Sequence, residues 1–165
     1  MSTSASFRIT GLSATPFRHL FALSDEALER QHARRIVADA KPGYPDRIGL
    51  RDVEVGESVI LVNYNHLPDD GPYRSSHAVF VAETDQDPFD AVDRIPQVLR
   101  SRMLSLRAFD AAGMMLDADL VDGGDVETLI ARLFTDPAVG FIHVHYAMRG
   151  CYACRIDRAD RHVAF

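Results

Sequence analysis

Apolar and polar side chains alternate most clearly in the middle of the chain and near its end. Residues 58–66 and 73–83 are rich in β-branched and aromatic side chains, and the turn-forming run LPDDGP separates them. This pattern predicts a β-hairpin. The same alternation predicts further strands at residues 7–10, 35–40, 48–53, 104–109, 114–121, 140–148 and 152–157.

Helical spacing of apolar residues is clearest after Asp125. That residue suits a helix N-cap, and the apolar side chains behind it recur every three or four positions, at Val126, Leu129, Ile130, Leu133 and Phe134. Asp87 and Pro88 form a typical helix start, so a helix is predicted over residues 88–99. Two shorter helices are predicted at residues 16–21 and 25–28.

The predicted strands are not separated by regular crossover helices, as they would be in a doubly wound α/β fold. The predicted fold class is therefore α+β, with a mostly antiparallel curved sheet or partial barrel and three to four helices. A length of 165 residues, 47% of them hydrophobic, fits one domain with a sizeable core. We expect residues 1–6 to be a loose tail and residues 7–165 to be a single domain.

Charge and composition exclude several classes of protein. The formal net charge is −6, and the 18 basic residues, all Arg except Lys41, are scattered among 24 acidic ones. A nucleic-acid binder concentrates basic residues on one face, so neither nucleic acid nor a membrane is an expected partner. No apolar run approaches the roughly 18 residues of a membrane span, and two cysteines make no disulfide framework. A cytoplasmic location follows as the expectation.

Two histidines share one face of the predicted strand 140–148. Side chains alternate along a strand, so His143 and His145 point away from its apolar face. Their spacing suits a shared metal ion or an acid/base pair. The alternative is a pair of solvent-facing histidines on an open sheet.

Further polar side chains gather at the turn of the central hairpin. His66 ends its first strand, and the second begins with the run Tyr73-Arg74-Ser75-Ser76-His77, so the two groups must end close together. A guanidinium, hydroxyls and imidazoles suit an anionic or carbonyl-bearing ligand. We therefore expect a pocket with ligand-binding residues His66, Tyr73, Arg74, Ser75 and His145, and with candidate catalytic acid/base groups His77 and His143. The alternative is that Arg74 and Ser75 form only local hydrogen bonds.

The motif Cys151-Tyr152-Ala153-Cys154 is a lone C-x-x-C pair. In redox proteins this motif opens a helix, whereas here it continues into a predicted strand that places the two sulfurs on opposite faces. Redox function is therefore not expected. A zinc site formed by His143, His145, Cys151 and Cys154 is an alternative, if the intervening residues turn the chain back. The sequence contains no Walker loop and no G-x-G-x-x-G, so no nucleotide cofactor is expected.

Several long segments resemble a known family. They are VADAKPGYPDRIGL, SVILVNYNHLPDDGPYRSSHAVFV, LSLRAFDAAGMMLDADLVDG and FIHVHYAMRGCYACRIDR. In this order and spacing, the chain resembles the bacterial domain-of-unknown-function family number twelve hundred and three. The resemblance implies a bacterial protein of one domain, and it implies no activity, cofactor or catalytic residue. By the same resemblance the family has Cys where this chain has Asp46 and none at Cys154, which counts against the zinc and redox alternatives.

Three hypotheses of function follow. The first is a small-molecule binding protein or enzyme, with Arg74 as an anion clamp in a pocket lined by histidine, arginine and serine. The second is an interaction module stabilised by zinc, and the third is a plain partner-binding scaffold without catalysis. Nothing in the sequence indicates an oligomeric state, a substrate or a pathway.

Overall fold

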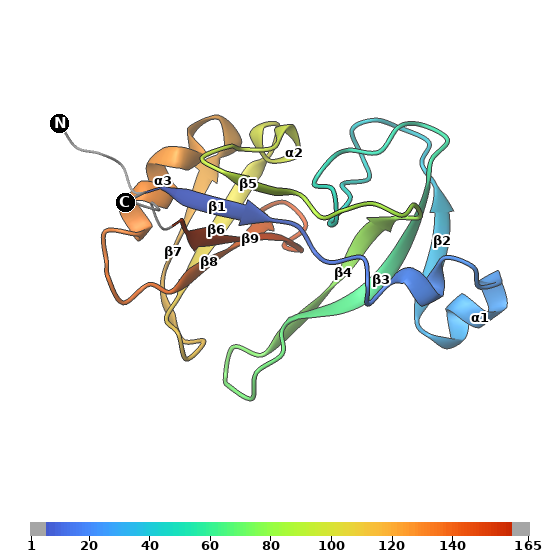
Figure 1. The fold of residues 1–165 in the computed structure, drawn as a ribbon, viewed down its shortest axis with the longest axis horizontal. Helices are drawn as coiled ribbons and strands as arrows, with labels where there is room; N and C mark the ends of the chain where they lie inside the picture. The colour runs from blue at the N-terminus through green and yellow to red at the C-terminus, as the bar shows by residue number, and fades with distance from the viewer. Residues whose placement is uncertain (1–5, 160–165) are drawn as a thin grey trace, which may run out of the picture.

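The computed structural model describes residues 6–159, which form two open antiparallel sheets (Figure 1). The larger sheet contains β1 (Phe7–Thr10), β5 (Asp90–Val92), β6 (Met103–Phe109), β7 (Met115–Asp122), β8 (Phe141–Tyr146) and β9 (Tyr152–Arg158). The smaller sheet contains β2 (Ala33–Val37), β3 (Ser58–Leu67) and β4 (Ser75–Ala82). Their spatial orders are β5-β1-β9-β8-β6-β7 and β2-β3-β4. The prediction of mostly antiparallel pairing is confirmed, but the sheets stay open and form no partial barrel.

Helices are few and short, so the described part of the chain is largely β. They are α1 (Asp25–Arg30), α2 (Gln97–Arg100) and α3 (Val126–Leu133), with the 3-10 turns η1 (Arg18–Leu20) and η2 (Gly123–Asp125). Helix α3 has the predicted position, and its buried side chains join those of β6, β8 and β9 in the main hydrophobic core. Its start differs from the prediction, because the side chain of Asp122 caps η2 and that of Asp125 makes no capping bond.

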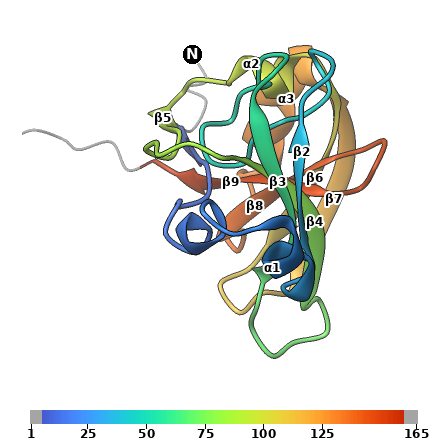
Figure 2. The same ribbon diagram turned by 90° about the vertical axis from the view of Figure 1, so that its right-hand side faces the viewer.

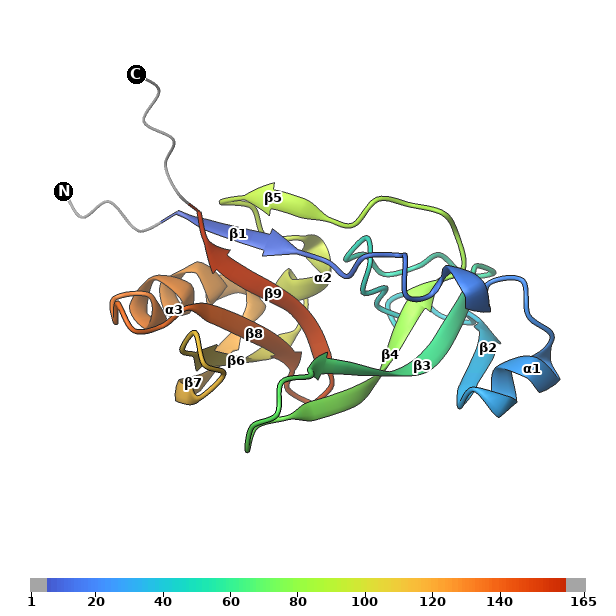
Figure 3. The same cartoon turned by 60° about the horizontal axis from the view of Figure 1, so that its bottom comes forward.

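The smaller sheet stands beside the larger one, and the β3–β4 hairpin reaches the face of the larger sheet that α3 does not cover. Figure 2, which looks along the long axis of the molecule, shows β3 and β4 running across the direction of β8 and β9. Figure 3 shows the hairpin next to the ends of β8 and β9. Two predicted antiparallel hairpins, β3–β4 and β6–β7, are confirmed by their register.

The segment 44–52 connects the two sheets, although it forms isolated bridges and not the strand predicted over residues 48–53. The fully buried carboxylate of Asp46 accepts hydrogen bonds from the N–H groups of Ile48, Gly49 and Ala82 and from the amide of Gln86. The buried guanidinium of Arg47 donates to the carbonyl oxygen of Tyr152 at 2.8 Å. This segment therefore ties the end of β4 to the start of β9.

The predicted helix over residues 88–99 is wrong in its first half. Residues Asp90–Val92 form β5, which pairs with β1, and the carboxylate of Asp90 forms a salt bridge with Arg8. The physical reason is that β1 would otherwise leave its backbone groups unpaired at the edge of the sheet. Only residues Gln97–Arg100 are helical, and the predicted helix at residues 16–21 is reduced to turns and η1.

Both chain ends lie outside the described residues, which excludes residues 1–5 of the predicted tail and the last six positions of the predicted domain. Ser6 is part of the fold, because its hydroxyl donates to Asp93 at 2.6 Å. The division into one domain stays a prediction. Between residues 6 and 159, no helix has the length and apolar character needed to cross a bilayer.

Candidate functional site

Both faces of β8 are covered, and this buries its two histidines. Ile142 and Val144 point into the core beneath α3, whereas His143 and His145 point to the opposite face, as the alternation predicts. Only 3% of His143 and 1% of His145 is exposed. The alternative of solvent-facing histidines is therefore wrong, because the β3–β4 hairpin covers this face.

The hairpin contributes two further imidazoles. His66 lies at a bulge near the end of β3, and His77 lies on β4. Their rings are stacked, with His66 Nε2 2.7 Å from His77 Nδ1. The ring centroid of His66 is 5.5 Å from that of His143 and 5.1 Å from that of His145. Segments far apart in the sequence thus bring four imidazoles together between the two sheets.

Three of these rings are close enough to share one ion. One ring nitrogen each of His66, His143 and His145 can be chosen so that the three atoms lie within 4.8 Å of one another. The Nδ1 atom of His66 is buried and has no hydrogen-bond partner among the residues described. We call these three side chains the histidine triad, and His77 contacts the triad through His66.

A β-bulge places an aromatic ring against the histidine triad. Between β8 and β9 the pairing shifts by one residue, so Ala153 is left out and Tyr152 pairs with His145. The bulge turns Tyr152 to the histidine face of the sheet. There its ring stacks on that of His66 with centroids 4.7 Å apart and an angle of 4° between planes. The imidazole of His66 is thus covered on one face by the ring of Tyr152 and contacts His77 through its Nε2 atom.

Hydrogen bonds determine the tautomer of one imidazole. His145 Nδ1 lies 2.9 Å from the carbonyl oxygen of Gly150, which only accepts hydrogen bonds. His145 Nδ1 therefore carries the proton, and Nε2 keeps its lone pair. No described residue accepts or donates a hydrogen bond at the ring of His143. The Nε2 atom of His145 and the Nδ1 atom of His66 thus have no hydrogen-bond partner among the described residues.

Burial keeps the triad neutral. Desolvation is the main cause that lowers the pKa of His66 to about 4, and the pKa of His143 and that of His145 to about 3. Neighbouring positive charges, among them Arg107, lower these pKa values further. Desolvation and the charge of Arg107 also lower the pKa of His77. At neutral pH the triad is therefore uncharged, and each imidazole can offer a lone pair.

Arg107 is a functional candidate that the sequence reasoning missed. It lies on β6 directly opposite His143 of β8 and on the same face of the sheet. Within residues 6–159 its guanidinium has neither a carboxylate partner nor a hydrogen bond, and its pKa is lowered by desolvation. A partly buried cation without a counter-ion is costly. The only signal in the sequence was a charged Arg within a largely apolar strand.

A cavity of about 240 Å³ lies beside the histidine triad, between the hairpin turn and β6. It is lined by His66, Leu67, Pro72, Tyr73, Arg74, Ser75, Arg107, Phe109, Met115 and His145. All five expected ligand-binding residues therefore line this one cavity. Arg74 lies at its exposed rim, where it is 3.3 Å from the carboxylate of Asp70. His77 and His143 are not part of the lining, and the ring of each lies next to that of His66.

The two cysteines lie outside the histidine triad. Cys154 is buried in the main core, on the opposite face of β9, and burial raises the pKa of its thiol to about 12. The Sγ atom of Cys151 lies 3.1 Å from Nη2 of Arg47. The expected zinc ligands His143 and His145 are thus grouped with His66, and neither sulfur belongs to that group.

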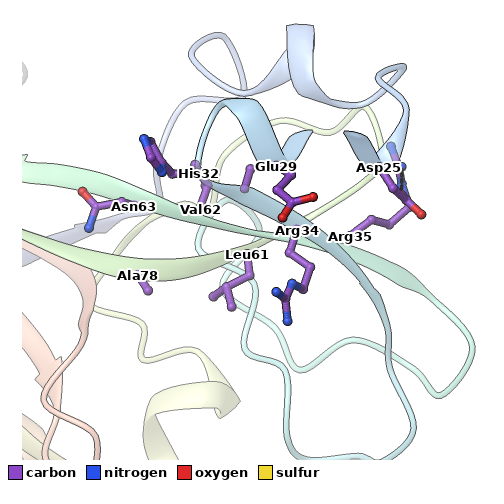
Figure 4. A pocket seen from close by; sticks show the side chains of 10 residues that line it. Asp25, Glu29, His32, Arg34, Arg35, Leu61, Val62, Asn63 and Ala78 are labelled. Carbon is purple, nitrogen blue, oxygen red and sulfur yellow. Dashed lines mark hydrogen bonds and ion pairs between the residues drawn. The ribbon is translucent and has the colours of Figure 1, made fainter. Parts of the chain in front are cut away.

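A larger hollow of about 690 Å³ lies on the outer face of the smaller sheet (Figure 4). Its charged side chains belong to α1 and β2, and most are exposed. The guanidinium of Arg35 is already paired with Glu83 and Asp25. No buried ionisable group is among its lining residues. The 240 Å³ cavity, which has buried imidazoles and an unpaired guanidinium, is therefore the stronger candidate site.

Comparison with protein families places the chain in one of them. Residues 43–158, more than half of the chain, match the family described as "Protein of unknown function (DUF1203)". The chain belongs to this family. The matched range contains the histidine triad, Arg107 and the cavity between them. Comparison with the curated proteins and with the solved structures gave no match.

Membership in this family carries no activity, so the chemistry of the site must be argued from its residues. The arrangement offers three things: a permanent positive charge at Arg107, neutral imidazoles, and the hydroxyl groups of Tyr73 and Ser75. Together these groups can donate several hydrogen bonds to one small molecule. The triad offers, in addition, lone pairs for a cation.

Proposed function

We propose that this protein binds a small anionic molecule in the 240 Å³ cavity beside the histidine triad. The single observation that carries the proposal is the guanidinium of Arg107, which has no partner among the residues described and lies at the cavity wall. An anion that paired with Arg107 would offset the cost of its desolvation. The planar fork of Arg matches a carboxylate or a phosphate with two hydrogen bonds.

The other residues that line the cavity favour a small, polar ligand. Ser75 and Tyr73 offer hydroxyl groups, and Arg74 at the rim adds a second positive charge. Phe109 and Met115 supply an apolar side, as is usual for sites of this kind. A volume of about 240 Å³ is below the range of drug-sized pockets, so the ligand class is a compact carboxylate or phosphate.

Proton transfer by the imidazoles would depend on their pKa values. A general base works best when its pKa lies near the working pH, whereas burial lowers the pKa of His143 to about 3. His77 is more exposed and is the better candidate for proton transfer. The roles of His77 and His143 as catalytic acid/base groups stay predictions, as does the cytoplasmic location.

Calorimetric titration of the EDTA-treated chain with inorganic phosphate and with malonate tests the proposal. We expect at least one of these anions to bind, with an affinity that falls as salt is added. The variant Arg107→Met should weaken binding about 10- to 150-fold, since a hydrogen bond to a charged group contributes about 1.5 to 3 kcal/mol. The matched control Arg18→Met, an exposed arginine outside the cavity, should bind as the wild type does.

The proposal would be contradicted if neither anion bound to the wild type, or if the Arg107→Met variant bound an anion as tightly as the wild type does. A direct role of the imidazoles in ligand binding would appear as weaker binding in His66→Phe. That variant fills the same space and removes both ring nitrogens.

Arg107→Met should also make the unliganded protein more stable. Replacement of a partly buried, unpaired cation by an apolar side chain removes its desolvation cost, so the free energy of unfolding should rise by about 1 kcal/mol. Urea unfolding of the wild type and the variant measures this difference. A loss of stability greater than about 1 kcal/mol would show that Arg107 has a structural partner and is not reserved for a ligand.

A further inference from the structure

We propose that His66, His143 and His145 together bind one divalent transition-metal ion of the zinc class. This site is independent of the proposed anion binding, because it requires no contact with Arg107 and no ligand in the cavity. The three side chains come from β3 and β8, which belong to different sheets. The proposal therefore also assigns the ion a place as a link between the two sheets.

The geometry is close to that of a bound ion. Each imidazole offers one nitrogen, and the three nitrogens lie within 4.8 Å of one another. Around zinc, with bonds of 2.0–2.1 Å in a tetrahedral arrangement, such nitrogens lie about 3.4 Å apart. A contraction on the order of 1 Å around the ion is therefore sufficient.

Two of the three ligand residues have hydrogen-bond arrangements that suit coordination. The buried Nδ1 atom of His66 has no other partner among the described residues, and a metal ion would satisfy it. His145 donates its Nδ1 proton to the carbonyl oxygen of Gly150, which leaves Nε2 free for the metal. A metal-binding imidazole commonly donates its other N–H to a carbonyl oxygen in this way. Burial keeps the three rings neutral, as coordination requires.

The donor set determines the class of metal. Three neutral imidazoles without a carboxylate suit zinc, cobalt or copper, whereas magnesium and calcium prefer oxygen ligands. The group that contains the triad includes no carboxylate. Three protein ligands leave a fourth position open, as in catalytic zinc sites. Because His66 and His145 also line the cavity, that position is available to water or to an anion from the cavity.

His77 is a positioning residue in this arrangement. When Nδ1 of His66 binds the ion, its Nε2–H donates to Nδ1 of His77 across 2.7 Å. This hydrogen bond fixes the orientation of the ligand ring, and the stacked ring of Tyr152 covers one of its faces. The positive charge of Arg107 opposes binding of a cation, and an anion between Arg107 and the ion would offset that repulsion.

Metal titration of the full chain, after removal of metal with EDTA, tests the site. We expect one equivalent of Zn²⁺ or Co²⁺ to bind per chain and Mg²⁺ not to compete. The Co²⁺ form should have the visible absorption of a tetrahedral or five-coordinate ion. In the wild type, NMR of the histidine ring nitrogens should show large shifts on addition of Zn²⁺ for three imidazoles only.

Matched variants assign the ligands. His66→Phe should weaken Zn²⁺ binding at least about 100-fold, which exceeds the effect of a lost outer partner. His77→Phe should weaken it about 10- to 100-fold. His77→Asn, whose amide oxygen replaces the acceptor Nδ1, should recover most of that loss and the Co²⁺ spectrum. The control His19→Gln, an exposed histidine outside the triad, should bind as the wild type does.

Each outcome decides the proposal. The absence of one-to-one binding, shifts of the size expected for coordination at ring nitrogens outside the triad, or unchanged affinity in His66→Phe would overturn it. If a variant fails to fold, the NMR shifts of the wild type alone give the result. Because the metal titration contains no anionic ligand and the anion titration uses protein freed of both metal and EDTA, failure of either proposal leaves the other result interpretable.

Discussion

Asp46→Ala is expected to lower the free energy of unfolding by about 3 to 5 kcal/mol. The carboxylate is fully buried and accepts four hydrogen bonds, three of them from backbone N–H groups. Removal of the acceptor leaves these donors buried without a partner, and each costs about 1 to 3 kcal/mol. The loss should be larger than that of an ordinary surface substitution, because Asp46 lies where the two sheets are joined.

Urea unfolding measures this effect, and two variants serve as comparisons. Asp46→Asn keeps one oxygen acceptor, so its loss should be intermediate. Asp69→Ala, at an exposed position in the hairpin turn, should change the free energy of unfolding by no more than about 0.5 kcal/mol. A loss below about 1 kcal/mol for Asp46→Ala would contradict the role assigned to this carboxylate.

Acidification of the metal-free protein should have the second largest effect. The pKa of His143 and that of His145 are lowered by burial to about 3 in the folded state, whereas an unfolded imidazole has a pKa near 6.5. Below pH 6.5 the unfolded chain therefore binds protons that the folded chain does not. Stability is full above pH 6.5 and falls as the pH decreases toward the folded pKa values.

The expected loss between pH 7.5 and pH 5 is about 2 to 4 kcal/mol for these two residues together. Groups that face them include Arg107 on β6 and His66 and His77 on the hairpin, and all of these oppose a second positive charge. Carboxylates contribute little in this range, since an unfolded carboxyl group has a pKa of about 4 and a lowered folded pKa, such as the value of about 2 for Glu57, lies lower still.

Urea unfolding of EDTA-treated protein across this pH range checks the prediction. The variant His19→Gln removes an exposed imidazole and should leave the pH dependence unchanged. A free energy of unfolding that stays constant between pH 7.5 and pH 5.5 would show that the two buried imidazoles are not neutral in the folded state. Added Zn²⁺ should oppose the acid-induced loss, because protons and the ion compete for the same nitrogens.

Local patterns were sufficient to predict the hairpins and the histidine face of β8. The turn residues between His66 and Tyr73 fix the register of β3–β4, and strict alternation places His143 and His145 on one side of β8. Helix α3 followed in the same way from its apolar spacing. These features depend on neighbours in the sequence, which is why the pattern is informative.

The features that the sequence did not predict depend on contacts between segments that are distant in the sequence. The apolar spacing around Phe89 suited a helix, but pairing with β1, about 80 residues earlier in the chain, made residues Asp90–Val92 a strand. Arg107 entered the site because β6 lies between β7 and β8, an order that no local pattern contains. Asp46 and Arg47 directly follow the run Lys41-Pro42-Gly43-Tyr44-Pro45, whose prolines and glycine are typical of irregular structure and predict no distant contact.

The bulge at Ala153 has a consequence for comparing related chains. The pairing with β8 shifts by one residue at the bulge. Tyr152 and Cys154 therefore line different faces of the sheet, although residues two apart in a regular strand share a face. A family member with one residue fewer between these points would present another side chain to the imidazoles. Alignments across β9 therefore need their gap at Ala153, since a gap elsewhere would equate core positions with positions that contact the histidines.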